Sequence, residues 1–557
     1  MGLSPLVASR AGRYPWPWRW PIPSDHEKRW VWWVILLLSL ALGALPLLPP
    51  TPAGADAVAF STERAMIHVD AIAQKPHPMG SEESIRVRDY IVSEMVDLGL
   101  TVEKQAFEVP DYFGTPGATV EAVNVIARLE GETPKGALLL VAHYDTVPAT
   151  PGANDNSAAV AVLMESARAL VSGTPLRNDV VFLFTDGEEP APRFGATAFI
   201  TSHPWFDDVV FVLNLEAIGN AGSSQLIEVS GSENLLIADL AASEPDPVAY
   251  SFITEFSDLI GGGGTDFTPF VDEGIPGLSF AYLHGSPIYH TEADSLSNVG
   301  LASLRHHGAH VLGLVHHFDD SDFSGIEAKS GANYFTFADW RVIRYPDAWA
   351  IPLSILSILT LGWALARKSR SGRLLRPVLT DTALALIAIL GTTLVSALAW
   401  QTIASIRPQM VIVESYLYFL FLLGAAYWAT AALLKRTTHR TGPNPVIGAI
   451  VIWAVLGVFT SLYAEGLSYL FVWPTIAGSL LVAYERSNLA RFGVIATLGI
   501  LWVPWIDFLL QMGQPRPGNP DSQLLPVTGL AVSLAVLAIV VIRKALLRRH
   551  ASAEATP

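Results

Sequence analysis

The sequence predicts an α/β domain, with a mixed and mainly parallel sheet covered by helices on both faces, joined to an all-α domain that spans a membrane. Short, mainly apolar runs at 137–142, 179–185 and 209–215 are separated by helical stretches, as in a parallel sheet that is buried on both faces. Beyond residue 345 the chain is mostly apolar. Charged residues make up only 15% of the 557 residues, and this low share is typical of membrane proteins.

The charges divide the chain into two parts. Residues 55–333 hold 12 Lys and Arg against 40 Asp and Glu, whereas the rest of the chain holds 23 against 11. We therefore expect an acidic soluble domain carried by a membrane domain with basic flanks. The acidic part shows no basic patch in sequence, which argues against a nucleic-acid partner.

The chain contains no cysteine, which excludes disulfides, thiolate metal sites and cysteine nucleophiles. Any metal must be held by histidines and carboxylates. Such ligands suit zinc, manganese or iron and argue against copper(I) and iron–sulfur centres.

The first 50 residues predict a membrane anchor. Residues 1–30 are rich in Pro and Trp and carry five basic residues, and residues 31–48 form an almost wholly apolar run with two Trp at its start. A cleavable signal peptide is the alternative, because residues 55–57 (Ala-Asp-Ala) resemble a small-x-small cleavage site. The length of the apolar run favours an uncleaved transmembrane helix over 31–50, since signal cores span about 7–15 residues.

Residues 55–339 are expected to form the soluble domain. Apolar residues at helical spacing predict a helix over 82–98 with Ser81 as its N-cap, and a second helix over 157–170. Strands are expected at 122–129, 137–142, 179–185 and 209–215. The four glycines at 261–264 form either a mobile lid or a plain surface loop.

Residues 345–543 are expected to form seven transmembrane helices, which with the anchor make eight spans. The predicted helices cover 346–366, 377–400, 411–434, 445–464, 466–484, 492–512 and 525–542. Every second connection between the predicted helices, together with the tail 544–557, is rich in Lys and Arg. By the positive-inside rule both termini, including segment 1–30, are cytoplasmic and the acidic domain is extracytoplasmic, either periplasmic or lumenal.

Polar side chains follow the predicted strands where each strand ends. His143 and Asp145 follow the run 137–142, and Asp155 comes from the next loop. Ligand sites of open α/β sheets form at the carboxyl ends of the strands, so these residues are candidates for chemistry. The alternative is that His143 merely ends a strand and Asp155 is a turn or helix-cap residue.

Later strand ends supply the partners that a metal site would need. Glu188 and Glu189 follow the run 179–185, and Glu216 follows the run 209–215. Further along, His290 stands in the segment Tyr-His-Thr-Glu-Ala-Asp at 289–294. Each feature alone has an ordinary structural explanation, but their conjunction at successive strand ends predicts a metal centre.

Four motifs carry a resemblance to a known family. H-x-D at 143–145, G-x-N-D-N at 152–156, D-G-E-E at 186–189 and Y-H-T-x-x-D at 289–294 resemble the two-zinc exopeptidases of metallopeptidase family 28. The resemblance covers about residues 66–297. Within the family, the chain is similar to the membrane-bound branch with a lumenal peptidase and a carboxyl-terminal helical bundle, the endoplasmic reticulum metallopeptidase and vacuolar membrane protease type.

The resemblance implies two Zn²⁺ per chain and a zinc exopeptidase fold. Carried over by position, His143 and Glu216 would ligate one zinc ion. Glu189 and His290 would ligate the other, and Asp155 would bridge both. A shared carboxylate makes chemical sense, because two nearby divalent ions repel each other.

The resemblance also implies roles beside the metal. Glu188 would be the general base that activates the zinc-bound water for attack on a peptide carbonyl. Tyr289 would donate to the developing oxyanion, with Tyr282 as a rival. Asp145 would fix the ring of His143 through its other nitrogen, and Asp294 would support the site from behind the ligands.

These features predict a membrane-anchored zinc exopeptidase, in particular an aminopeptidase, whose partners are a peptide substrate and a lipid membrane. A carboxypeptidase or dipeptidase of the same fold is an alternative. A catalytically inactive receptor or scaffold is another, but such proteins typically lack ligands. The helical bundle could also transport or present substrate. The sequence leaves the oligomeric state open.

Two further groups of residues attract hypotheses. A cluster of five histidines lies on a predicted helix, and a polar, solvated helix is a better interpretation than a second metal site; its members are His306, His307, His310, His316 and His317. Acidic residues fall within or near predicted spans at Asp381, Glu414 and Asp507. Asp507 suggests substrate or proton handling, or alternatively lies at the outer end of its helix.

Overall fold

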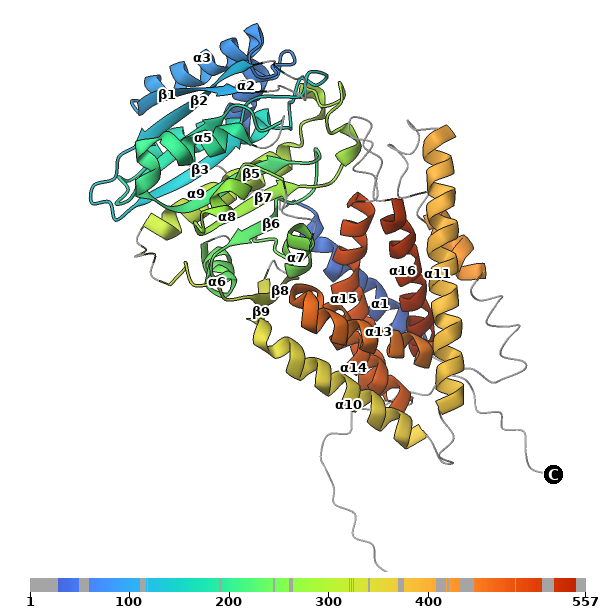
Figure 1. Cartoon of the computed structure of the whole chain (residues 1–557). Coiled ribbons are helices and arrows are strands. Elements are labelled where there is room, and N and C mark those ends of the chain that lie inside the picture. Colours follow the sequence, from blue (N-terminus) through green and yellow to red (C-terminus); the bar gives the residue numbers. More distant parts are fainter. Residues whose placement is uncertain are drawn as a thin grey trace, which may run out of the picture.

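The structure is a computed structural model, shown in Figure 1. It describes residues 29–49, 60–110, 117, 119–189, 193–243, 246–259, 264–319, 321, 323, 325–338, 341–368, 375–406, 417, 420–429, 445–485, 487–512 and 525–546. The predicted glycine run falls at 261–264, of which only Gly264 lies among these residues.

A seven-stranded sheet forms the centre of the acidic domain, in the order β1-β2-β4-β3-β5-β7-β6. The strands are β1 (Thr101–Val109), β2 (Val120–Leu129), β3 (Ala137–His143), β4 (Asp179–Thr185), β5 (Val209–Ala217), β6 (Gln225–Ser230) and β7 (Gly277–Tyr282). The four central strands β4, β3, β5 and β7 are parallel, and the antiparallel strands lie at the two edges. The predicted α/β class with a mixed sheet is confirmed.

Alternating residues of β3 face two separate cores. Leu138 and Leu140 pack with helices α2 (Thr62–Ile72), α3 (Glu82–Asp97), α4 (Ser157–Ser172) and α9 (Leu301–Asp319) on one face. Leu139 and Val141 pack with α5 (Phe194–Ser202) and α8 (Phe267–Asp272) on the other. Because successive side chains of a strand point to opposite faces, this double coverage explains why the run 137–142 is wholly apolar.

Helix α3 begins where the sequence predicts. The Ser81 hydroxyl accepts a hydrogen bond from the Ser84 amide at 3.0 Å, as expected of an N-cap. Glu82 and Glu83 occupy the first turn, where the helix dipole favours negative charge. The predicted start of this helix is confirmed.

The prediction of a solvated histidine cluster is wrong for three of its five members, whereas His316 is exposed and His317 is half-buried. His306, His307 and His310 are fully buried on α9. The Ser224 amide donates to His306 Nδ1 at 3.1 Å, and His307 Nε2 lies 3.1 Å from the Glu216 carbonyl oxygen. These rings can pack against the sheet because backbone groups in or next to its strands form hydrogen bonds with the ring nitrogens. Among the described residues, none of the five belongs to a candidate metal cluster.

The rest of the described chain forms apolar helices. These are α1 (Arg29–Ala44), α10 (Ala350–Lys368), α11 (Leu375–Ile406), α13 (Pro445–Tyr463), α14 (Tyr469–Ala483), α15 (Asn488–Met512) and α16 (Leu525–Leu546). Each provides a span long and apolar enough to cross a membrane, which gives seven candidate spans among the described residues. Much of the predicted helix 411–434 lies outside the described residues, which include the shorter apolar helix Leu420–Ala429.

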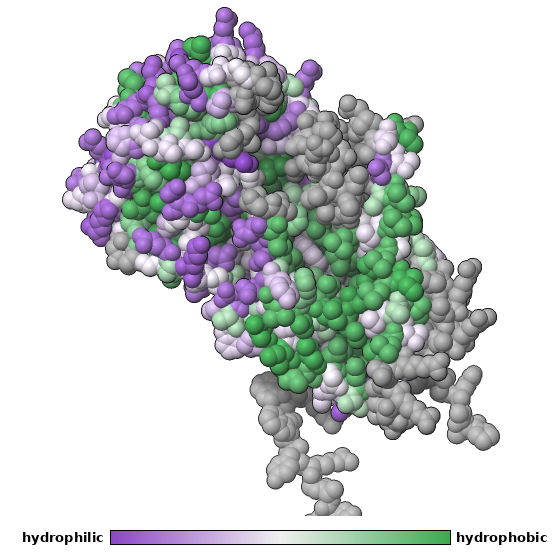
Figure 2. Space-filling model, viewed as in Figure 1, coloured by the Kyte–Doolittle hydropathy of each residue, from purple (hydrophilic) through white to green (hydrophobic). Residues whose placement is uncertain are grey.

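The surface follows the same division. Figure 2 shows hydrophilic residues over the sheet domain and a broad hydrophobic surface over the helical bundle. Helices α6 (Glu233–Ser243) and α7 (Ser251–Leu259) and the hairpin of β8 (Ala332–Phe337) and β9 (Arg341–Pro346) lie between the sheet and the bundle (Figure 1).

Candidate metal centre

The candidate side chains meet at the carboxyl ends of the parallel strands. His143 is the last residue of β3, and Glu216 lies near the end of β5. Glu188 and Glu189 follow β4 after Gly187, whose φ of +84° is a backbone conformation that side chains disfavour. This turn brings two glutamates to the same edge of the sheet as His143.

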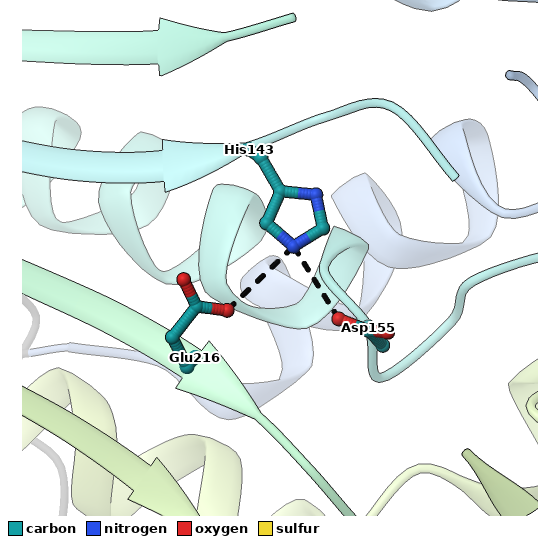
Figure 3. Close-up of side chains that lie close together, drawn as sticks. All are labelled: His143, Asp155 and Glu216. Carbon is teal, nitrogen blue, oxygen red and sulfur yellow. Dashed lines mark ion pairs between the residues drawn. The ribbon is translucent and has the colours of Figure 1, made fainter. Parts of the chain in front are cut away.

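The first group consists of His143, Asp155 and Glu216, all buried (Figure 3). His143 Nε2 lies 3.3 Å from Asp155 Oδ1 and 3.6 Å from Glu216 Oε2. His143 Nδ1 lies 3.0 Å from the backbone carbonyl oxygen of Asp145. Because a carbonyl oxygen only accepts, Nδ1 carries the proton in the neutral ring, and the lone pair of Nε2 faces the two carboxylates.

The second group shares Asp155 with the first. His290 Nε2 lies 3.3 Å from Asp155 Oδ2 and 3.1 Å from Glu189 Oε2. Two ligand atoms bound tetrahedrally to one zinc ion at about 2.0 Å lie roughly 3.3 Å apart. The observed separations therefore match the spacing of atoms that bind a common ion.

Several buried polar atoms of the site lack a hydrogen bond within the described chain. These atoms are Asp155 Oδ2, Glu189 Oε1 and His290 Nε2. An unsatisfied buried polar atom is costly, so groups of this kind normally have a partner. A divalent cation would satisfy them, and the all-oxygen-and-nitrogen donor set suits zinc.

The electrostatics of the site favour a positive charge. Burial lowers the pKa of His290, but its contacts with Asp155 and Glu189 outweigh burial and raise that pKa to about 10. Burial raises the pKa of Asp155, but His143 and His290 outweigh it and lower that pKa to about 2. The same carboxylates would stabilise a bound divalent ion, which requires neutral histidines.

Two aspartates hold the candidate ligands in place. The carboxylate of Asp145 accepts hydrogen bonds from the amides of Glu188 at 3.1 Å and Glu189 at 3.3 Å. Its carboxylate oxygen lies 3.7 Å from His143 Nδ1, so Asp145 contacts that ring chiefly through its backbone carbonyl oxygen. The carboxylate of Asp294 accepts hydrogen bonds from the amides of Asn154 at 2.8 Å and Asp155 at 3.0 Å.

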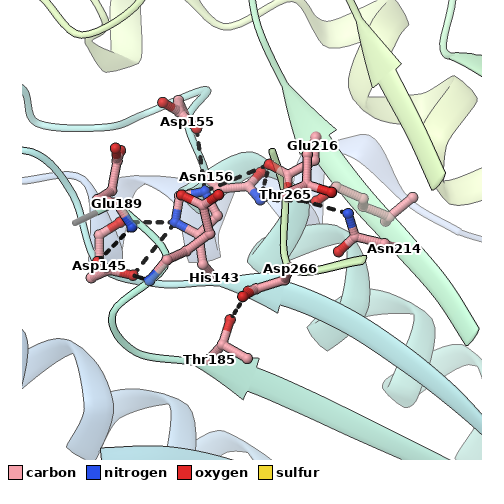
Figure 4. A network of polar contacts seen from close by, with 12 residues as sticks. His143, Asp145, Asp155, Asn156, Thr185, Glu189, Asn214, Glu216, Thr265 and Asp266 are labelled. Carbon is pink, nitrogen blue, oxygen red and sulfur yellow. Dashed lines mark hydrogen bonds and ion pairs between the residues drawn. The ribbon is translucent and has the colours of Figure 1, made fainter. Parts of the chain in front are cut away.

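The structure adds residues to which sequence reasoning assigned no role (Figure 4). The side-chain amides of Asn156 and Asn214 donate hydrogen bonds to the carboxylate of Glu216, each at 3.2 Å. Asp266 is fully buried and accepts a hydrogen bond from the Thr185 hydroxyl. Burial raises the pKa of Asp266 to about 7, and the charge of nearby His143 opposes the rise. In the sequence, the only mark of Asp266 is its position in a Thr-Asp pair directly after the glycine run at 261–264.

Glu188 lies beside the two groups and belongs to neither. Burial raises the pKa of its carboxyl well above the usual value, while the positive charge of His143 opposes that rise. Its Oε1 is 4.0 Å from Nε of Arg193, which in turn donates to the carbonyl of Gly264 at 2.7 Å. Glu188 is 13% exposed, so it can reach a molecule that enters the site.

The two candidate tyrosines differ in setting. The ring of Tyr289 stacks on His290 with 3.8 Å between ring centroids. Tyr282 is buried, and its hydroxyl donates to Asn154 at 3.3 Å. Tyr289 therefore adjoins a candidate ligand, whereas the hydroxyl of Tyr282 bonds within the fold.

Sequence comparison places this site in a known family. Residues 124–315 match the family described as Peptidase family M28. The chain carries a peptidase family M28 domain. All the candidate site residues fall inside this M28 domain, and the resemblance stated from the motifs is confirmed.

Curated relatives of this chain are metallopeptidases or membrane proteases by name. Endoplasmic reticulum metallopeptidase 1 of Rattus norvegicus is 28% identical over 456 residues, which cover 75% of this chain and 50% of the relative. Vacuolar membrane protease of Candida dubliniensis is 31% identical over 254 residues, or 42% of this chain and 26% of the relative. The chain thus spans about half or less of the length of these relatives.

Among solved structures, the M28 domain is similar to a zinc aminopeptidase from Bacillus subtilis, with 17% identity and a TM-score of 0.40, covering 51% of this chain and 100% of that one. A glutaminyl cyclase from Porphyromonas gingivalis has 19% identity and a TM-score of 0.39, covering 47% of this chain and 98% of the other.

Proposed function

We propose that the chain is a membrane-anchored exopeptidase with two zinc ions, and specifically an aminopeptidase. The observation that carries this proposal is Asp155. One of its oxygens faces His143 and the other faces His290, inside a peptidase family M28 domain. A carboxylate placed in this way is suited to bridge two cations.

In this proposal His143 and Glu216 hold one zinc ion, Glu189 and His290 hold the other, and Asp155 is shared. Zinc bound in such a site acts as a Lewis acid and makes water a nucleophile at neutral pH. Asp145 and Asp294 hold the backbone segments that carry the ligands.

The chain's own residues supply the proton transfers. Glu188 accepts a proton from the water that attacks the peptide carbonyl carbon, and then returns it to the amine nitrogen as the carbon–nitrogen bond breaks. A raised pKa suits this task, because the base must also act as an acid in the second step. Tyr289, stacked on His290, is the proposed donor to the oxyanion.

The charge of the site supports action at a free amino terminus. Carboxylates outnumber cationic side chains around the two candidate groups; they are Asp145, Asp155, Glu188, Glu189, Glu216, Asp266 and Asp294. The negative charge of these carboxylates attracts a substrate ammonium group. Two divalent ions would neutralise only part of that negative charge, and the remainder would still attract the ammonium group.

Arg193 favours the second candidate function, a carboxypeptidase or dipeptidase. Its side chain is 24% exposed and lies 4.0 Å from Glu188. A guanidinium group beside the general base could pair with a substrate carboxylate. The two functions therefore differ in which end of the peptide must be free.

A peptide library separates them. We expect the detergent-solubilised full chain to release residues from peptides with free amino termini, and to lose this activity when the terminus is acetylated or a chelator is added. Amidation of the carboxyl terminus should have little effect. The reverse pattern, with loss on amidation only, would establish the carboxypeptidase alternative. No hydrolysis by a chain that holds two zinc ions would support the inactive scaffold instead.

We further propose that the M28 domain is extracytoplasmic, on an eight-span chain with both termini in the cytoplasm. The basic connections support this orientation. Since the natural chain has no cysteine, single introduced cysteines report topology without background. We expect a membrane-impermeant maleimide to label Thr201→Cys, at an exposed position, in intact cells or sealed vesicles of native orientation, and to label Ser371→Cys only after permeabilisation. The opposite labelling would reverse the proposed orientation.

A further inference from the structure

The M28 domain and the helical bundle share one apolar core. Phe252 and Phe256 of α7 pack against Phe508 of α15, with ring centroids 5.5 and 5.3 Å apart. Ala281 of β7 and Leu283, just after that strand, belong to the same buried cluster. The end of the strand that precedes His284 therefore belongs to the same buried cluster as the bundle.

One ion pair crosses this interface. His284 Nε2 lies 2.7 Å from Oδ2 of Asp507, which stands in the candidate span α15. The two side chains are 17% and 13% exposed. Burial lowers the pKa of His284, but the hydrogen bond to Asp507 and its charge outweigh burial and raise that pKa. Removing one partner of such a pair leaves the other charge uncompensated in a poorly hydrated place.

The backbone of His284 is also hydrogen-bonded, on the side away from Asp507, to a neighbouring loop of the M28 domain. The backbone carbonyl of His284 accepts hydrogen bonds from the amides of Asn220 at 2.8 Å and Ala221 at 3.0 Å. Gly222 has φ +90°, and a Cβ there would lie 2.9 Å from the His284 ring. The imidazole of His284 therefore lies between Gly222 on one side and Asp507 of α15 on the other.

From His284 the chain runs directly into the metal centre. Gly285 and the 3-10 helix Ser286–Ile288 lead to His290, six residues after His284. The segment then continues to Asp294, which accepts the amide hydrogen bonds that hold Asn154 and Asp155. Segment 284–294 thus carries one candidate ligand and supports the shared one.

We propose that Asp507 of the membrane bundle is a positioning residue for the metal centre. Its ion pair with His284 fixes the start of segment 284–294, and so sets His290 relative to Glu189 and Asp155. This inference rests on the proposed two-metal function and deepens it. The bundle is then a structural part of the peptidase site, in addition to any role as an anchor.

The test is the metal affinity of Asp507→Asn in the full chain, measured by titrating the metal-free protein with Co²⁺ and following its visible absorption. Changes behind a metal ligand typically lower affinity by about 10–100-fold. We expect a loss of this size for one of the two ions and little change for the other. Asp507→Glu, which keeps the charge, should recover part of the affinity.

Glu255→Gln is the matched control. Glu255 of α7 accepts a hydrogen bond from the Gly466 amide of the bundle at 2.9 Å, so it also joins the two parts, but through α7 and not through segment 284–294. We expect its two metal affinities to match those of the unaltered chain. An equal loss in both variants would overturn the inference, because general loosening of the interface would then explain it.

The two proposals fail in distinguishable ways. If the unaltered chain binds two ions and Asp507→Asn binds both as tightly, the positioning role is wrong and the proposed function stands. If the unaltered chain binds fewer than two ions, both proposals are wrong, and this is evident before any substitution is made.

Discussion

Glu188→Gln is expected to keep both zinc ions and to lower kcat by about 10²–10⁴-fold, the range that a general base contributes. Glu188 belongs to neither candidate metal group, so the substitution removes no proposed ligand. Glutamine has nearly the same size and cannot accept the proton from the attacking water. Turnover of a peptide with a free amino terminus and zinc per chain, measured on the same sample, check the prediction.

Glu189→Gln is the matched comparison, because it makes the same chemical change at the adjacent residue. Glu189 Oε2 lies 3.1 Å from His290, and we expect this variant to lose zinc together with activity. Full turnover in Glu188→Gln would exclude it as the base. Loss of zinc from Glu188→Gln would instead identify it as a ligand.

The sequence predicts much of the candidate metal centre because strand ends are visible in it. Runs such as 137–142 are buried on both faces, so their apolar character marks both the strand and the point where it ends. In a parallel sheet these ends meet at one edge, which is why His143 and Glu216 could be expected at one site although they are 73 residues apart in the chain. The structure brings them to 3.6 Å.

Other features depend on contacts that no local pattern records. His307 is buried because the carbonyl of Glu216 on β5 and the hydroxyl of Ser224, just before β6, lie within reach although both are far away in sequence. Its helix therefore looked solvated from composition alone. In the same way Asp507 could be recognised as an unusual intramembrane acid, but its partner His284 lies 223 residues earlier. Proximity of this kind comes only from the folded chain.

Asp155→Asn is expected to remove both metal ions, whereas His143→Ala and His290→Ala should each weaken chiefly one. Asparagine occupies the same volume, and its backbone amide can still donate to Asp294. It carries no charge, however, and only one of its two terminal atoms is an acceptor. It can therefore face His143 or His290 with an oxygen, but not both.

The expected loss of affinity exceeds the roughly 10–100-fold that changes behind a ligand cause, because Asp155 itself is the proposed shared ligand. Competition with a chelating dye measures this loss, and zinc per chain after dialysis gives the stoichiometry. Asp272→Asn is the control, since the same change at an exposed residue of α8 should leave two ions bound. Two tightly bound ions in Asp155→Asn would show that each site is complete without a shared carboxylate, and the bridging role would have to be abandoned.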